Sequence, residues 1–177
     1  MTLPQKAESI QQQLRALGID REVIRFPEGV HTAKAAAAAL GIEVGAIANS
    51  LIFWMADAPL LVMTSGRHRV DTPALAEQLG EGPIERATPE QVRASTGQVI
   101  GGVAPLGHPT PIRTLVDVAL RDYPQLSAAA GTPDTVFMLS YDELVRITGG
   151  EERVVGELAA TRSHLPQTGA AYTRQSD

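Results

Sequence analysis

Two apolar segments in the middle of the chain constrain its fold most. Residues 50–56 and 60–64 are apolar at nearly every position, and the turn-forming sequence Asp57-Ala58-Pro59 separates them. Two apolar runs of this length joined by a short turn predict a β-hairpin. Because neither run alternates with polar residues, we expect both faces of the hairpin to be covered, as at the centre of a sheet.

Helices are predicted around this hairpin from apolar spacing, capping residues and glycine stops. They cover residues 4–17, 33–40, 72–79, 89–96 and 141–147, with a helical turn at 44–48. Short strands are predicted at 22–26, 113–118 and 135–139, a turn-rich connection at 127–133, and a last short element at 152–155. Strands and helices mix without regular βαβ alternation. We therefore predict one α/β domain over residues 1–160, with a mixed, mostly antiparallel β-sheet and packed helices, followed by a disordered polar tail at 161–177.

Composition excludes several classes of protein. The 177 residues include no cysteine, so disulfides and thiolate sites are excluded, and the four histidines lack zinc-ligand spacing. We expect no metal and no cofactor. The net charge of -5 argues against a protein that coats nucleic acid, although a local contact with an RNA end stays possible. The chain has no signal-like segment and no membrane-length apolar run, so we expect a cytoplasmic protein.

The stretch from Gly101 to Pro109 contains three glycines, two prolines and a histidine. Glycine permits unusual backbone conformations and close approach, whereas proline fixes φ and removes a donor. One interpretation is a shaped loop whose remaining N–H groups point at a ligand. The other is a tight connection between two strands, and composition alone does not decide between them.

Two further segments place polar residues at the ends of predicted strands. Arg69 lies in the first, Gly66 to Asp71, and suits phosphate or carboxylate recognition, unless it pairs with Asp71 to fix the loop. The second is Asn49-Ser50, just before the first hairpin strand. Asn49 is either a turn residue or an amide directed into a cleft beside the glycine-rich loop.

Taken in order, these segments resemble the family of YbaK-like aminoacyl-tRNA deacylases, which also occurs as the editing domain of bacterial prolyl-tRNA synthetases. The matching segments span about residues 25–150, and the glycine-rich loop fits the family's G-x-x-x-P pattern at Gly101 and Pro105. The segments are His31-Thr32-Ala33 with the helix to Leu40-Gly41, Ile47 to Phe53, Arg69-Val70-Asp71, Gly101 to His108, Gly131-Thr132-Pro133 and Glu143-Leu144.

The resemblance implies hydrolysis of the ester between a wrong small amino acid and the 3′ end of a tRNA, with tRNA-Pro as the expected tRNA and prolyl-tRNA synthetase as a candidate partner. It implies that water attacks with help from the terminal ribose hydroxyl. Backbone N–H groups of Gly101 and Gly102 would stabilise the oxyanion, and Asn49 would orient the ester or ribose. The expected substrate-binding residues are His31, Ser50, Arg69, Val103, Pro105 and His108, with Asp71 holding Arg69 and with Ala48, Leu51, Ile100 and Val103 as pocket walls.

One departure from the family concerns Asn49, where many members carry a lysine tied to activity. Asparagine can still form hydrogen bonds but has no positive charge. The chain can use Asn49 as a neutral donor, rely on Arg69 or His108, or have kept binding without catalysis. The alternatives to a deacylase are therefore a catalytically silent module that binds tRNA or a synthetase, and an enzyme acting on another small ester or amide.

Overall fold

The predicted hairpin forms the centre of the structure, a computed structural model that describes residues 2–28 and 30–158. Strands β2 (Ile47–Met55) and β3 (Ala58–Ser65) pair antiparallel along their whole length. The turn between them consists of Ala56 and Asp57, which both have positive φ angles (49° and 62°). Two such residues form the hairpin turn that matches strand twist. The turn thus lies one residue earlier than predicted, and Ala58 and Pro59 belong to β3.

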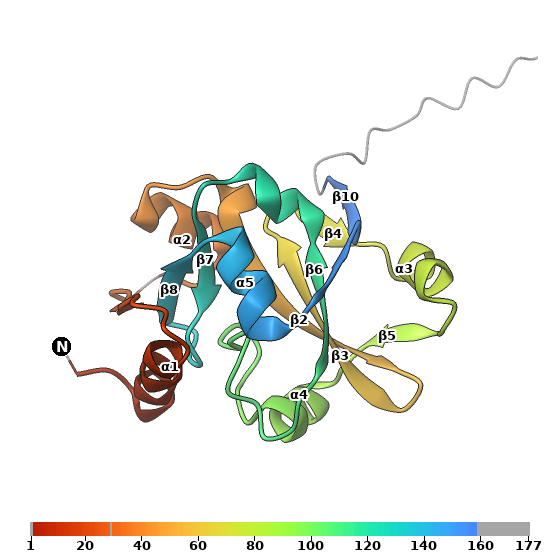
Figure 1. Ribbon diagram of the computed structural model, residues 1–177, viewed down its shortest axis with the longest axis horizontal. Helices are drawn as coiled ribbons and strands as arrows, with labels where there is room; N and C mark the ends of the chain where they lie inside the picture. The colour runs from red at the N-terminus through yellow and green to blue at the C-terminus, as the bar shows by residue number, and fades with distance from the viewer. Residues whose placement is uncertain (1, 29, 159–177) are drawn as a thin grey trace, which may run out of the picture.

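The remaining elements assemble around this hairpin (Figure 1). The other strands are β1 (Val23–Arg25), β4 (His68–Val70), β5 (Ile84–Arg86), β6 (Arg113–Asp117), β7 (Leu126–Ala129), β8 (Thr135–Leu139), β9 (Glu151–Arg153) and β10 (Gly156–Leu158). The helices are α1 (Gln5–Ala16), α2 (Ala33–Leu40), α3 (Thr72–Leu79), α4 (Pro89–Thr96) and α5 (Tyr141–Thr148), with 3-10 turns η1 (Val44–Ala46) and η2 (Val118–Asp122).

The main sheet has the order β1-β8-β7-β2-β3-β6-β9, and β5 also pairs with β2. Strands β2–β7, β3–β6 and β6–β9 pair parallel, and the other pairs described, including the separate β10–β4 pair, are antiparallel. The predicted α/β fold with a mostly antiparallel sheet is confirmed. No helix among the described residues combines the length and apolar character needed to cross a bilayer.

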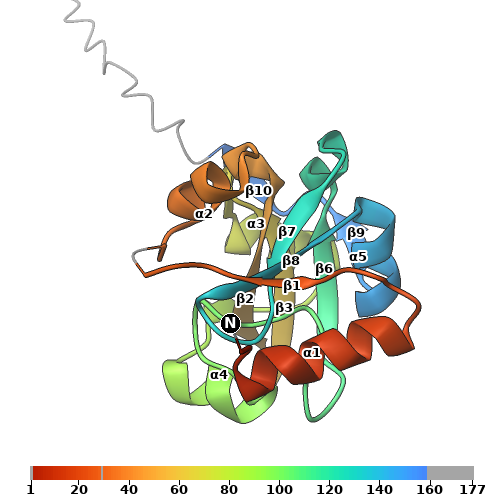
Figure 2. The ribbon, with the colours of Figure 1, turned by 90° about the vertical axis from the view of Figure 1, so that its left-hand side faces the viewer.

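Helices cover both faces of the sheet, as the apolar hairpin predicted. Ile10 and Leu14 of α1 and Leu144 of α5 pack into a core with Leu61 and Met63 of β3. Leu75 of α3 packs on the other face, beside Phe53, Leu60 and Val62. Figures 1 and 2 show α5 and α3 on opposite sides of the hairpin.

The capping residues place four of the five helix starts where the sequence predicts them. Thr32, Asp71, Thr88 and Ser140 each accept a hydrogen bond from a backbone N–H in the first turn of the helix that follows. Such caps fix where a helix begins because they satisfy donors that have no partner in the helix. The cap at Thr32 positions α2 and, just before it, the segment that carries His31.

The sequence prediction is wrong or incomplete in several segments. Residues 126–129 form the strand β7 rather than a turn-rich connection, because backbone pairing with β2 on one side and β8 on the other holds this segment extended. The turn expected at 44–48 ends at Ala46. The three-residue strands β4, β5 and β10 were not predicted. The predicted tail at 161–177 lies outside the described residues and stays a prediction.

Candidate functional site

A cavity of about 250 Å³ lies where the sheet is interrupted on one side of β2. On that side, β7 pairs only with Ile47 and Ala48, and β5 pairs only with Phe53 to Met55. The start of α2, strand β8 and the first residues of the glycine-rich loop close the remaining sides. Five of the predicted site residues line this cavity: His31, Asn49, Ser50, Gly101 and Val103. The predicted wall residues Ala48, Leu51 and Ile100 also line it.

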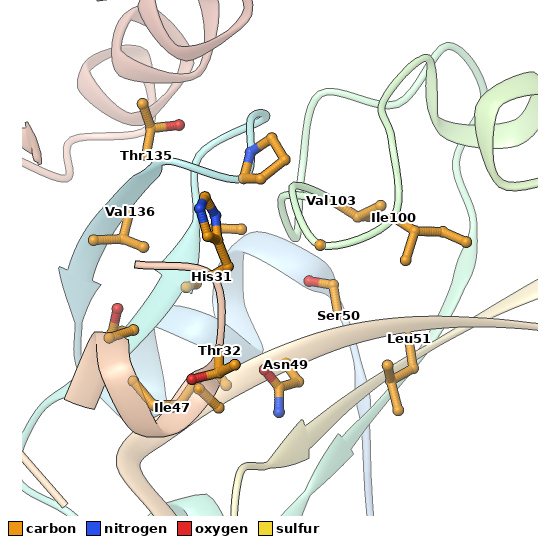
Figure 3. Close-up of a pocket in the computed structure, with 18 of the residues that line it drawn as sticks. His31, Thr32, Ile47, Asn49, Ser50, Leu51, Ile100, Val103, Thr135 and Val136 are labelled. Carbon is orange, nitrogen blue, oxygen red and sulfur yellow. The ribbon is translucent and has the colours of Figure 1, made fainter. Parts of the chain in front are cut away.

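Asn49 and Ser50 lie on opposite faces of β2 because successive side chains of a strand alternate. Figure 3 shows the Ser50 side chain on the side of the strand where Val103 and Ile100 lie, while the side chains of Asn49 and Leu51 lie on the other side. The hydroxyl of Ser50 is 3.3 Å from the sulfur of Met63. The Asn49 amide therefore lies on the face of β2 opposite to the glycine-rich loop, Ser50 lies on the same face as the loop, and a role for Asn49 at the site stays a prediction.

The glycine-rich loop follows α4 and offers two main-chain donors. Gly101 has a φ of +87°, and neither its N–H nor that of Val103 donates to an acceptor in the described part of the chain. The N–H of Gly102, in contrast, donates to the carbonyl of Val99 at 2.9 Å. Gly102 therefore shapes the loop and does not offer its N–H to a ligand in this structure.

Close packing explains why residue 102 is a glycine. A Cβ atom there would lie 2.6 Å from the carbonyl carbon of Thr132 and 2.8 Å from the nitrogen of Pro133. Real Cβ atoms do not approach backbone atoms so closely, so a larger residue would displace the loop or the turn before β8. The glycine-rich loop and the Gly131–Pro133 turn therefore pack directly against each other.

Pro105 and His108 support this loop from outside the cavity. Pro105 is buried, and a nitrogen of the His108 ring, Nε2, lies 2.8 Å from the carbonyl oxygen of Ala104. The Ala104 N–H in turn donates to Oε1 of Gln98 at 2.6 Å. Burial lowers the pKa of His108, and the hydrogen bond to Ala104 opposes this shift only in part. Neither Pro105 nor His108 is among the residues that line the cavity.

Arg69 and Asp71 also lie outside the cavity. Asp71 caps α3 by accepting a hydrogen bond from the N–H of Ala74 at 3.0 Å. Arg69 is exposed in β4, opposite Glu157 of β10, and forms no ion pair with the described residues. The structure therefore corrects the expectation that Asp71 holds Arg69 at the site.

Sequence reasoning missed several contributors to the cavity, among them Arg86 and Ser127. Arg86, the last residue of β5, lines it, is exposed, and forms no ion pair within the described residues. Ser127 in β7 lines it as well. A three-residue strand gives no periodic signal that could have marked Arg86, and Ser127 was hidden in a segment predicted as a turn. Among the described residues that line the cavity there is no carboxylate, and no metal-binding cluster is found in the described ranges.

An interrupted sheet, a small cavity and free N–H groups on a glycine-rich loop together define an α/β domain that can hold a small group carrying hydrogen-bond acceptors. The chain belongs to the family of aminoacyl-tRNA editing domains, whose family model matches residues 27–147. Both the predicted family and the predicted fold are confirmed.

Similar proteins agree with this assignment. A solved structure provisionally assigned as a trans-editing enzyme for prolyl-tRNA synthetase is 39% identical, with a TM-score of 0.84, and the match covers 88% of this chain and 99% of that one. EbsC of Enterococcus faecalis, provisionally assigned as a Cys-tRNA(Pro)/Cys-tRNA(Cys) deacylase, is 25% identical over 68% of this chain and 74% of its own.

The proline–tRNA ligase of Nitratidesulfovibrio vulgaris (strain Hildenborough) is 30% identical over 107 residues. This match covers 60% of the present chain but only 19% of the ligase. The chain thus spans about a fifth of the length of the synthetases that it resembles.

Proposed function

We propose that this protein is a trans-acting deacylase that removes a wrong small amino acid from the 3′ end of a tRNA in the cytoplasm. The observation that carries the proposal is the pair of N–H groups, on Gly101 and Val103, that have no acceptor within the described residues and belong to residues lining a cavity sized for a small acyl group. Membership in the editing-domain family supports this reaction class, and tRNA-Pro is the tRNA that the related proteins suggest.

The chemistry needs no protein nucleophile and no metal. A water molecule attacks the ester carbonyl, and the loop N–H groups stabilise the negative charge that forms on its oxygen. The bond from the acyl carbon to the ribose oxygen then breaks. That oxygen takes up the proton released by the water, with the neighbouring ribose hydroxyl as the relay. The products are the free amino acid and the uncharged tRNA.

Small side chains around the cavity support selection by size. Ala33 and Ala36 of α2, Ala48 of β2 and Ala128 of β7 all line it. An apolar pocket distinguishes one methylene group by only ~1–3 kcal/mol, so a synthetase makes errors with small amino acids and a second site has to remove them. A cavity with these walls suits an alanyl, seryl or cysteinyl group.

Polar residues around the cavity suit the terminal nucleotide. Arg86 carries a positive charge to the cavity in a protein whose net charge is -5, and a guanidinium group suits a phosphate. We place His31 and Asn49 beside the terminal ribose, where both side chains can form hydrogen bonds with hydroxyl groups. Arg69 and His108 have no direct role in this arrangement.

A second candidate is a catalytically silent module that binds tRNA ends or a synthetase. Asn49 favours it, because this residue of the cavity lining cannot supply the charge of a lysine. The loop donors do not depend on that charge, so we retain hydrolysis as the first proposal.

Deacylation assays distinguish the two candidates. The purified protein is incubated with tRNA-Pro charged with alanine, cysteine or serine, and the charged fraction is followed against spontaneous hydrolysis. We expect acceleration with at least one small amino acid and none with proline. If no charged tRNA is deacylated faster but tRNA still binds at low salt, the silent module is correct.

A further inference from the structure

One residue of β2 has an open edge inside the cavity. Strand β7 ends its pairing with β2 at Ala48, and β5 begins at Phe53. Between them, the carbonyl of Ile52 accepts a hydrogen bond from the N–H of Ala87 at 3.2 Å. Within residues 2–28 and 30–158, Ser50 has no such neighbour on this side, and it lines the cavity.

The direction of the Ser50 backbone follows from the pairing on the other side. Residues of an antiparallel strand direct their N–H and C=O alternately toward the partner strand and away from it. The carbonyl of Ile47 accepts from the N–H of Gly66 across the hairpin at 2.8 Å, whereas the carbonyl of Ile52 points away from β3. Counted along the strand from either Ile47 or Ile52, this alternation directs the N–H and C=O of Ser50 away from β3, into the gap where the cavity lies.

An aminoacyl ester matches this edge. Its amine and its ester carbonyl lie on the two sides of one α-carbon, as the N–H and C=O do in a residue of a strand. A strand edge binds an extended ligand through such groups. Resting on the function proposed above, we infer that the aminoacyl group docks on Ser50 as a one-residue addition to the sheet. The amine donates to the Ser50 carbonyl, and the Ser50 N–H donates to the ester carbonyl.

The charges around the cavity agree with recognition by the main chain. Among the described residues that line it there is no carboxylate, and Arg86 carries a positive charge. The α-amine of the substrate therefore depends on neutral acceptors, and one of these is the Ser50 carbonyl, which has no partner on this side in the part of the chain that the structure describes. A site built to pair with a substrate group discriminates against an analogue that lacks it, since its own polar group is then left unpaired.

The test compares alanine with propionate, which has the same carbon skeleton but no amine. Transfer RNA-Pro is charged with each, and each enzymatic rate is divided by the spontaneous hydrolysis rate of the same ester. We expect the alanyl ester to be accelerated about 10- to 100-fold more than the propionyl ester. Equal normalised rates would overturn the docking mode while leaving the deacylase function intact.

Two variants separate the main chain of Ser50 from its hydroxyl. Ser50→Ala keeps the backbone and loses only a hydroxyl whose partner is the weakly accepting sulfur of Met63. It should keep the preference for the alanyl ester. Ser50→Pro removes the outward N–H, at a position where proline does not interrupt the β3 ladder. It should lose at least tenfold in alanyl hydrolysis. If Ser50→Ala lost the preference for the alanyl over the propionyl ester, the hydroxyl and not the main chain of Ser50 would recognise the amine.

Amide-linked analogues test the docking mode without hydrolysis. Adenosine derivatives that carry a 3′-alanylamino or a 3′-propionylamino group are titrated into ¹⁵N-labelled protein. We expect the alanyl compound to bind about tenfold more tightly and to shift the Ser50 amide resonance. Equal affinities would overturn the docking mode even if the proposed reaction fails. If the protein prefers the alanyl compound here but hydrolyses no ester in the deacylation assay, the docking mode is supported and the deacylase is rejected.

Discussion

Asn49 lies directly across the β2–β3 ladder from Thr64, whose buried hydroxyl has no hydrogen-bond partner within the described residues. A buried hydroxyl without a partner destabilises the folded state. Thr64→Val replaces it with a methyl group of similar size. We therefore expect the free energy of unfolding to rise by about 1 kcal/mol in chemical denaturation.

Thr135 provides the matched control for this substitution. It is equally buried in a strand, but its Oγ1 lies 2.6 Å from Oγ1 of Thr132. Thr135→Val should therefore lower the free energy of unfolding by about 1 kcal/mol. Equal changes in the free energy of unfolding would contradict the finding that the Thr135 hydroxyl is hydrogen-bonded and the Thr64 hydroxyl is not.

The role proposed for Asn49 predicts opposite outcomes for two variants. Asn49→Ala removes the amide of a residue that lines the cavity and should lower kcat/KM for deacylation about tenfold. Asn49→Lys restores a donor with a positive charge and should reach at least the wild-type value. Single-turnover deacylation measures both, and Gln125→Ala, at an exposed position outside the cavity, is the control. An unchanged rate in Asn49→Ala would remove this residue from the site.

The sequence predicts those parts of the fold that depend on local patterns. The unbroken apolar runs predict the covered hairpin, and capping residues such as Thr32 and Asp71 predict where helices begin. Strand β7 could not be predicted because Ser127, Ala128 and Ala129 have little strand propensity, and pairing with β2 and β8 makes the segment a strand. Tertiary contacts determine whether such a segment forms a strand, and a local sequence pattern contains no information about them.

The candidate site is predictable in its location and less so in its geometry. Gly101 and Val103 could be identified from the glycine-rich loop, and His31 from the resemblance. The orientation of Asn49 depends on the register of β2, which a run that is apolar on both faces leaves undefined. Arg86 comes from a three-residue strand whose position is set by its pairing with β2, so its place at the cavity could not be predicted.

Gly102 should be the residue of the glycine-rich loop that is most sensitive to a methyl group. Gly102→Ala places a Cβ atom against the backbone of Thr132 and Pro133, and we expect the displaced loop to lower deacylation at least tenfold. Gly80→Ala is the control, since Gly80 has a φ of +67° at the end of α3 and no atom near its Cβ position. That variant should lose about 1 kcal/mol of stability with unchanged kcat/KM.

Arg86 is expected to bind the tRNA backbone. Arg86→Gln should raise KM about tenfold with little change in kcat, because it removes a charged contact outside the reacting ester. The dependence of KM on salt concentration should also become weaker, since fewer counterions are released when tRNA binds. Arg93→Gln, on the exposed side of α4 and outside the cavity, should change neither. Equal effects of the two substitutions would show that only overall charge matters.

His108 should make the stability of the fold depend on pH. Burial lowers the pKa of His108, whereas an unfolded chain takes up a proton near the ordinary value of about 6.5. When the pH falls from about 7 to 5.5, the unfolded state therefore binds more protons at this residue, and the free energy of unfolding decreases. His108→Gln can still donate to the Ala104 carbonyl but does not titrate, so its stability should decrease less over the same interval. Urea unfolding at pH 7.5, 6.5 and 5.5 measures the difference, and parallel curves for the two proteins would contradict this role of His108.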